Sequence, residues 1–410
     1  MANQPIPFTL AVPNSDIQRL HAKLESSTLP NEVDGAGWDY GAPLADIKRL
    51  VERWRTGYDW RKVEQEINDT YPMFTIDVPV DGFGTLNIHY THKESSCPNA
   101  IPLLFVHGWP GSILEVGKLL PHLISESPEH PSFHVVAFSL PGFGFSEPPL
   151  KRGFATAQYA EVGHKLMLAL GYNEYVTQGG DLGFWASFIT RIIGKKYGPK
   201  HSKAWHTNFT SSSEPPKFLD TPLLYLRHLV TPYTEREKAS LARQREWLAR
   251  GRGYFAEHST QPQTLAYSLT DSPVGLLAWI YEKLVRWTDD DYQWDDDEVL
   301  TWVSWYWFSR GGPMSSLLIY YEMVHNSDRK FTSAEAPSIP MGVSHFPKEV
   351  FPAPRIWTHT SGNLVFESEH DHGGHFAAHE KPLELVADVR NMFGRGGPAY
   401  SVVPGRTGYA

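Results

Sequence analysis

An aspartate stands at the centre of a short glycine-rich segment that is suited to nucleophilic chemistry. Residues 179–183 read Gly-Gly-Asp-Leu-Gly, between a β-like run and a helix-like run. A strand that turns sharply into a helix needs small residues on both sides of the turn, and Gly179 and Gly183 meet that need. Asp181 would then lie near the positive end of the helix, where its carboxylate can attack carbon and form an ester. The alternative is a turn in which Asp181 only caps the helix.

A second candidate element ends an apolar strand upstream of this turn. Residues 107–110 read His-Gly-Trp-Pro. The backbone N–H of Trp109, together with that of Leu182, can hold an oxyanion that forms when an ester is cleaved. A simple strand-ending turn is the alternative interpretation.

A histidine near the C-terminus is the candidate base. His375 lies in a Gly-Gly-His-Phe-Ala-Ala segment at 373–378, and its ordinary pKa of about 6.5 suits the activation of water. A carboxylate must orient the ring, and Glu349 is the preferred candidate because it follows a strand-like run. Three acidic residues nearer in sequence remain competitors: Glu367, Glu369 and Asp371.

The same region could instead hold a metal ion. His370, Asp371, His372 and His375 are closely spaced, as zinc ligands often are. No obvious second cluster elsewhere in the sequence supplies further ligands, so this reading is disfavoured. We therefore expect neither a metal nor a cofactor.

Composition excludes several classes of protein. The chain has 410 residues, of which 41% are hydrophobic, so an ordered globular protein is expected. The net charge of −9 argues against nucleic acid as a partner. The single cysteine, Cys97, rules out an internal disulfide. The sequence shows neither a secretory signal nor about 20 consecutive apolar residues, so a soluble, cytoplasmic protein is expected.

Strand and helix patterns alternate from about residue 100, which predicts an α/β fold with a mainly parallel sheet. Helical patterns then dominate before two late strands, which indicates a helical lid inserted over the carboxyl ends of the strands. The predicted organisation is an N-terminal extension at 1–95, a core at 96–211 and 336–393, a helical lid at 212–335 and an ordered-to-frayed tail at 394–410.

Some helix boundaries are also predicted. Asn14 or Ser15 is expected to cap the first helix, and a helix is expected over 113–124. Ser272 followed by proline predicts the start of a lid helix. The acidic run at 295–298 is expected to be a solvated helix cap.

Three segments together resemble those of the microsomal-type epoxide hydrolases, including their soluble fungal members. They are His-Gly-Trp-Pro-Gly-Ser at 107–112, the aspartate turn at 179–183 and the histidine segment at 373–378. The similarity continues at 58–61 and 271–273 and spans almost the whole chain. It implies an α/β-hydrolase fold with an N-terminal extension and a lid.

The resemblance also implies residue roles. Asp181 matches the family nucleophile, His375 the base that activates water, and Glu349 its acidic partner. Tyr254 and Tyr320 match two lid tyrosines that hydrogen-bond the epoxide oxygen. Phenols suit this task because an opening epoxide develops alkoxide charge that a phenol can stabilise.

Three features of the sequence bear on this resemblance. Tyr321, next to Tyr320, is a competitor because sequence alone does not say which ring faces the site. Leu182 follows the nucleophile where related dehalogenases carry tryptophan, which disfavours a dehalogenase. The transmembrane helix of the membrane-anchored members has no counterpart here, which implies a soluble enzyme.

The predicted function is cofactor-independent hydrolysis of a small-molecule epoxide to a vicinal diol. One alternative is an enzyme that rearranges or cyclises an epoxide in a biosynthetic pathway. Another is a non-catalytic small-molecule receptor on the same scaffold. A serine esterase is disfavoured because the turn lacks a hydroxyl. A homodimer is compatible with the sequence, which leaves the oligomeric state open.

Overall fold

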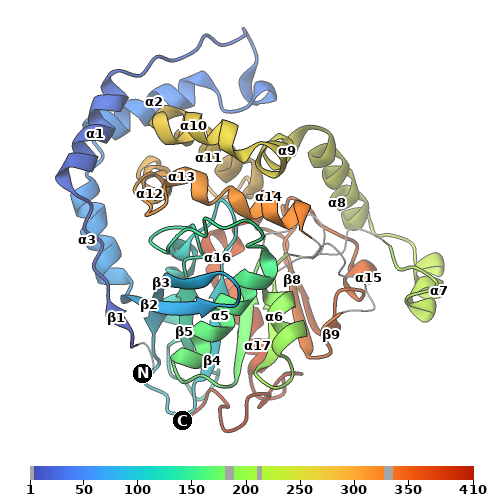
Figure 1. Ribbon diagram of the computed structural model, residues 1–410. Coiled ribbons are helices and arrows are strands. Elements are labelled where there is room, and N and C mark those ends of the chain that lie inside the picture. The colour runs from blue at the N-terminus through green and yellow to red at the C-terminus, as the bar shows by residue number, and fades with distance from the viewer. Residues whose placement is uncertain (1–3, 181–188, 210–214, 327–335) are drawn as a thin grey trace.

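A mixed β-sheet forms the centre of the molecule. The computed structural model in Figure 1 describes residues 4–180, 189–209, 215–326 and 336–410. The described strands form one sheet of nine strands in the order β1-β2-β3-β5-β4-β6-β7-β8-β9. Pairing is antiparallel from β1 to β3 and between β3 and β5, and parallel from β5 to β9. The sheet is therefore mainly parallel, as predicted.

The parallel strands are apolar because both of their faces are covered. β4 (Ile101–Val106) and β5 (Phe133–Phe138) are buried at every position. β6 (Tyr175–Gly179) is also buried throughout. The remaining strands are β1 (Ile6–Pro7), β2 (Met73–Val80), β3 (Gly84–Lys93), β7 (Ser202–Thr207), β8 (Pro340–His345) and β9 (Asn363–Glu369). The carboxyl ends of β4, β6 and β8 thus share one edge of the sheet, which is where ligands bind in parallel sheets.

Helices cover both faces of the sheet. α5 (Thr156–Ala169) and α6 (Ile189–Tyr197) pack against each other on one face (Figure 1). α17 (Pro382–Phe393) contacts β8 and the short helix α4 (Leu120–Leu123) on the other. α15 (Arg355–Thr358) is a single turn between β8 and β9, and α16 (Ala377–Glu380) is a single turn between β9 and α17.

Helices α9 to α14 lie across one end of the sheet, whereas α8 runs down at its side and α7 projects outward near α15 (Figure 1). Ser272 caps α11 by accepting a hydrogen bond from the N–H of Gly275 (2.9 Å), as its sequence predicted. Within the described part of the chain, no helix has the combined length and apolar character needed to cross a bilayer. The bounds of these helices are α7 (Pro222–Val230), α8 (Glu235–Glu246), α9 (Gly253–Thr260), α10 (Pro262–Asp271), α11 (Pro273–Trp287), α12 (Asp296–Trp307), α13 (Gly312–Ser315) and α14 (Leu318–His325).

The N-terminal segment packs against these lid helices. Its helices are α1 (Asn14–Glu25), α2 (Leu44–Thr56) and α3 (Trp60–Thr70), and α1 and α2 contact α11. Arg53 forms a bidentate ion pair with Asp297 (both 2.7 Å), and Arg49 pairs with Asp296. The predicted helix cap is confirmed, since the Asp295 carboxylate accepts the N–H of Asp297 (2.9 Å), but Asp296 and Asp297 are ion-paired as well as solvated. The run caps α12 and also ties the N-terminal segment to the lid.

Three other sequence-based expectations differ from the structure. The stretch 113–124 forms a short 3₁₀ turn and α4 instead of one helix, since Pro121 has no backbone N–H to donate to the carbonyl of Gly117. Pro13, rather than Asn14 or Ser15, precedes α1. The tail is not frayed: the backbone of Gly408 accepts from Ser132 (2.8 Å) and donates to Asn99 (2.7 Å).

A partly buried charged cluster joins the lid to the core. Oε1 of Glu298, at the start of α12, accepts from Tyr292 (2.6 Å), from His379 on α16 (2.6 Å) and from Lys118 (3.1 Å). Burial alone would raise the pKa of Glu298, but these contacts outweigh burial and lower the pKa to about 2.

We therefore expect Glu298→Gln to lose stability in a pH-dependent way. A carboxyl group whose folded pKa lies below its unfolded value of 4.5 stabilises the fold above pH 4.5 and loses that effect as the pH falls toward 2. The variant should be less stable than the parent by about 2 kcal/mol at neutral pH, and the difference should shrink at about pH 3. Urea denaturation at both pH values measures it, with the exposed Glu66→Gln as control. A difference that stays constant with pH would contradict the assignment.

Candidate active site

The carboxyl end of β6 leads into the predicted nucleophile turn. A Cβ atom at Gly179 would lie 2.6 Å from the carbonyl oxygen of Val106 on β4, so only glycine fits there without displacing the neighbouring strand. A Cβ at Gly180 would lie 2.7 Å from the side chain of Asn208. Asp181, Leu182 and Gly183 lie outside the described residues.

Lid helix α12 holds the turn that carries Trp109. The Trp302 indole N–H donates to the carbonyl of Pro110, and the Tyr306 hydroxyl donates to that of Gly111 (2.6 Å). Ser112 and Glu115 close a reciprocal capping box just beyond. The backbone around Trp109 is thus fixed from the lid side, by two aromatic residues that the motif analysis did not single out.

His375 and Glu349 form a buried pair. Nδ1 of His375 lies 2.6 Å from Oε1 of Glu349, and the two residues are 6% and 3% exposed. The same oxygen accepts from the N–H of Val350 (2.7 Å). Because a carboxylate can only accept, the contact places the imidazole proton on Nδ1 and leaves Nε2 to receive one.

The three competing carboxylates have other partners. Glu367 contacts His345 (2.8 Å) and Arg355. Glu369 lies 3.6 Å from Arg355, and Asp371 lies 3.3 Å from Arg236. Glu349 is thus the carboxylate that the structure brings to His375.

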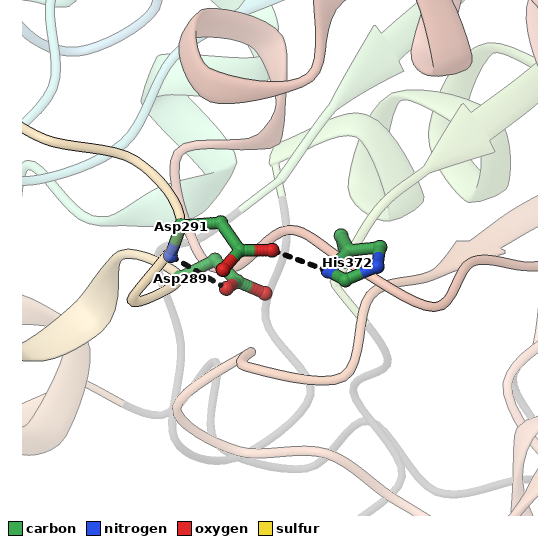
Figure 2. A group of neighbouring side chains, drawn as sticks. All are labelled: Asp289, Asp291 and His372. Atoms are coloured by element: carbon green, nitrogen blue, oxygen red, sulfur yellow. Dashed lines mark hydrogen bonds and ion pairs between the residues drawn. The ribbon is translucent and has the colours of Figure 1, made fainter.

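The histidines considered as metal ligands contact different carboxylates. His370 contacts Asp388 (2.6 Å), and His372 contacts Asp291 (2.6 Å). Figure 2 shows that Asp289, Asp291 and His372 do lie together and could in principle offer three ligand atoms. However, Oδ1 of Asp289 accepts the N–H of Asp291 (3.1 Å) and Oδ2 accepts that of Gly373 (2.7 Å). Both carboxylate oxygens of Asp289 therefore already accept backbone hydrogen bonds, which explain its position without a metal ion.

Of the three candidate tyrosines in the lid, two have rings that contact each other. Tyr254, on α9, and Tyr320, on α14, are buried, and their ring centroids lie 5.9 Å apart at 85°. Tyr321 is half-buried and stacks on His325 (4.2 Å). A one-residue step along a helix rotates the side chain by about 100°, so only one of two adjacent tyrosines can face the partner ring. That residue is Tyr320.

Aromatic contacts connect the tyrosines to both other parts of the site. The Trp109 indole stacks on Tyr254 (5.3 Å, 10°) and meets the edge of Tyr320 (6.0 Å). Trp287, at the end of α11, contacts both Tyr254 (5.1 Å) and His375 (5.0 Å). The turn after β4, the base and the lid tyrosines therefore converge.

Two buried ionisable residues beside the tyrosines were not singled out by the sequence analysis. Burial lowers the pKa of His258 to about 3, so its ring, 5.0 Å from that of Tyr320, is neutral. Burial also lowers the pKa of Lys283, whose Nζ lies 5.6 Å from the Tyr254 ring centroid. Their positions on α9 and α11 fit an ordinary helical pattern, so no sequence signal marked them.

The fold defines the class of the protein. The sheet order, the parallel core and the helical insertion at its carboxyl edge are those of an α/β hydrolase, and a family model described as "alpha/beta hydrolase fold" matches residues 101–244. A second model, "Epoxide hydrolase N terminus", matches residues 5–116. The predicted fold class is confirmed.

Individual relatives define the family. Epoxide hydrolase 1 of Sus scrofa is 33% identical over 426 residues, covering 95% of this chain and 88% of that protein. The solved structure of Aspergillus niger epoxide hydrolase has a TM-score of 0.80 and 33% identity, with 95% of each chain covered. The juvenile hormone epoxide hydrolase of the silkworm Bombyx mori has a TM-score of 0.82 and 28% identity, with 94% of this chain and 93% of that one covered. The chain belongs to the epoxide hydrolase family, as its motifs indicated.

Proposed function

We propose that the protein hydrolyses an epoxide to a vicinal diol through an ester on Asp181. Similarity to epoxide hydrolases over nearly the whole chain supports epoxide hydrolysis as the activity. The buried His375–Glu349 pair is the observation that carries the two-step scheme, since a base of this kind serves a water-dependent step. The position of Asp181 is inferred from the sequence motif and from Gly180, which precedes it at the end of β6.

In the first step, a carboxylate oxygen of Asp181 attacks a ring carbon and the carbon–oxygen bond of the epoxide breaks. The oxygen that leaves becomes an alkoxide. Tyr254 and Tyr320 donate hydrogen bonds to it and supply its proton.

In the second step, Nε2 of His375 removes a proton from water, and the water oxygen attacks the carbonyl carbon of the ester. The backbone amides of Trp109 and Leu182 hold the oxyanion, which collapses as the bond between the acyl carbon and the diol oxygen breaks. The imidazolium of His375 gives its proton to the leaving alkoxide, and the second proton of the water returns to the tyrosinate left by the first step, so the diol is released and Asp181 is again a carboxylate. Glu349 stabilises the imidazolium that forms.

A small cavity beside the base suits this water. Its volume is about 10 Å³, which is about the smallest that can admit the centre of one water molecule. Gly108, Glu115, Gly180 and Asn208 line it together with His375. A water held there would lie next to the base and next to the backbone from which Asp181 extends.

The variant His375→Gln should separate the two steps. Without the base, an epoxide should still alkylate Asp181, but the ester should persist because water is no longer activated. Intact-protein and peptide mass spectrometry after incubation with a reactive epoxide should show one adduct on Asp181. Asp181→Ala is the control and should show none. The scheme is wrong if His375→Gln carries no added mass while the parent makes diol.

The lid tyrosines should affect the first step. Tyr254→Phe and Tyr320→Phe should each slow alkylation by roughly tenfold to a hundredfold, since one of two donors to the alkoxide is lost. Tyr321→Phe is the matched control because its ring faces His325. Single-turnover kinetics measure the rate of ester formation. Equal effects from Tyr320→Phe and Tyr321→Phe would contradict the assignment.

We also propose that the protein is a cytoplasmic homodimer. The segment around α7 exposes several large apolar side chains, including Leu219 (94%), Leu223 (82%) and Val230 (79%), and such a surface favours burial against a second copy. Light scattering should give a mass near twice 46.4 kDa, and replacing Leu223 by Glu should reduce it to that of one chain. A mass of 46.4 kDa for the parent would contradict the dimer.

A further inference from the structure

Two buried carboxylates lie behind the loop that carries His375, and the proposed reaction does not use either of them. Asp289 follows lid helix α11 and is 5% exposed, whereas Glu380 ends core helix α16 and is 6% exposed. Burial of a charged group is unfavourable unless hydrogen bonds compensate it, so their partners indicate what they do.

Glu380 binds backbone from both sides of the lid–core boundary. Its Oε1 accepts the N–H of Phe376, next to His375 (3.0 Å), and its Oε2 accepts the N–H of Asp289 (3.0 Å). One carboxylate thus connects the His375 loop with the end of the lid helix.

Asp289 makes the reciprocal connection. Its Oδ2 accepts the N–H of Gly373 in the His375 loop (2.7 Å). Its other oxygen accepts the N–H of Asp291 (3.1 Å), which keeps the carboxylate turned toward the loop (Figure 2). These hydrogen bonds outweigh burial and hold the pKa of Asp289 below its usual value.

The backbone itself closes the connection. The N–H of His375 donates to the carbonyl of Trp287, the last residue of α11 (2.8 Å). A Cβ at Gly374 would lie 2.5 Å from that carbonyl oxygen, so the loop lies directly on the helix end. The N–H groups of Gly373, His375 and Phe376 therefore all donate to acceptors at the boundary between lid and core. These are Asp289, the Trp287 carbonyl and Glu380, respectively.

The position of Glu380 is unfavourable for its negative charge. Burial, together with the negative charges of Asp289 and Glu349, raises the pKa of Glu380 to about 7. A carboxylate kept among other carboxylates is unfavourable for stability alone. It does, however, provide two acceptor oxygens oriented toward fixed backbone N–H groups.

We propose that Asp289 and Glu380 are positioning residues that hold the His375 loop against the lid helix and thereby set the imidazole for the water step. This inference rests on the proposed function. His375 must place Nε2 within hydrogen-bond reach of a water while Nδ1 keeps its contact with Glu349. Both conditions depend on the backbone at 373–376, which these carboxylates hold from the lid side. The packing of the lid helix on the core and the alignment of the imidazole thus depend on the same contacts.

The test separates the two chemical steps in Glu380→Gln and Asp289→Asn. Each change keeps the size of the side chain but replaces one acceptor oxygen by an NH₂ group, which cannot accept the backbone N–H. Glu161→Gln is the matched control, because Glu161 on α5 is a buried carboxylate that accepts a backbone N–H (Asp81, 2.9 Å) far from the site. Single-turnover kinetics of the full-length protein with a reactive epoxide give the rates of ester formation and ester hydrolysis.

The expected result is a hydrolysis rate lowered by about tenfold or more in both variants, because small displacements of a catalytic group have effects of this size. Ester formation should change by less than about twofold, since the hydrogen bonds described for these two carboxylates go to the backbone at 289–291 and 373–376. Glu161→Gln should change neither rate.

Three outcomes would overturn the inference. Both rates could be unchanged, both could fall in parallel, or only thermal stability could fall, and each would show a purely structural role. If Glu380→Gln does not fold, Asp289→Asn decides alone. Failure of the proposed function would be recognised separately, because the parent itself would then form no ester.

Discussion

The buried contact between His375 and Glu349 is the constraint on which the rest of the structure depends. An imidazole paired with a carboxylate is expensive to bury, and the pair persists only where the surrounding backbone determines its geometry. Glu349 follows β8 and His375 follows β9, so adjacent parallel strands deliver the pair to one edge of the sheet. The remaining elements bring the turn after β4, the end of β6 and two phenols to that same edge.

The lid is held from several directions, and this explains how side chains from distant helices meet at the base. The N-terminal segment binds α12 through Arg49 and Arg53, and α12 in turn holds the backbone after Trp109 through Trp302 and Tyr306. The extension, the lid and the core therefore form one packed unit. The geometry of the site depends on all three of them.

Local features of this architecture could be predicted from the sequence, whereas pairings across elements could not. The apolar run of β4 and the Ser272 cap follow from residue types within a few positions. By contrast, the sequence pattern did not predict β7, because Lys203 and His206 interrupt the apolar run of this buried strand. The choice of Glu349 over nearer carboxylates, like that of Tyr320 over Tyr321, depends on which strands and helix faces become neighbours. Asp289 and Glu380 escaped notice because their partners are backbone N–H groups, which have no sequence signature.

The most direct test follows the oxygen atoms during one turnover. Enzyme in excess over an epoxide, in H₂¹⁸O, should release a diol without ¹⁸O, because its new oxygen comes from the carboxylate of Asp181. The label should appear in the peptide that contains Asp181, since water replaces the oxygen that the carboxylate has lost. Diol that carries ¹⁸O from the first turnover, with Asp181 unlabelled, would show that water attacks the epoxide directly and would contradict the account.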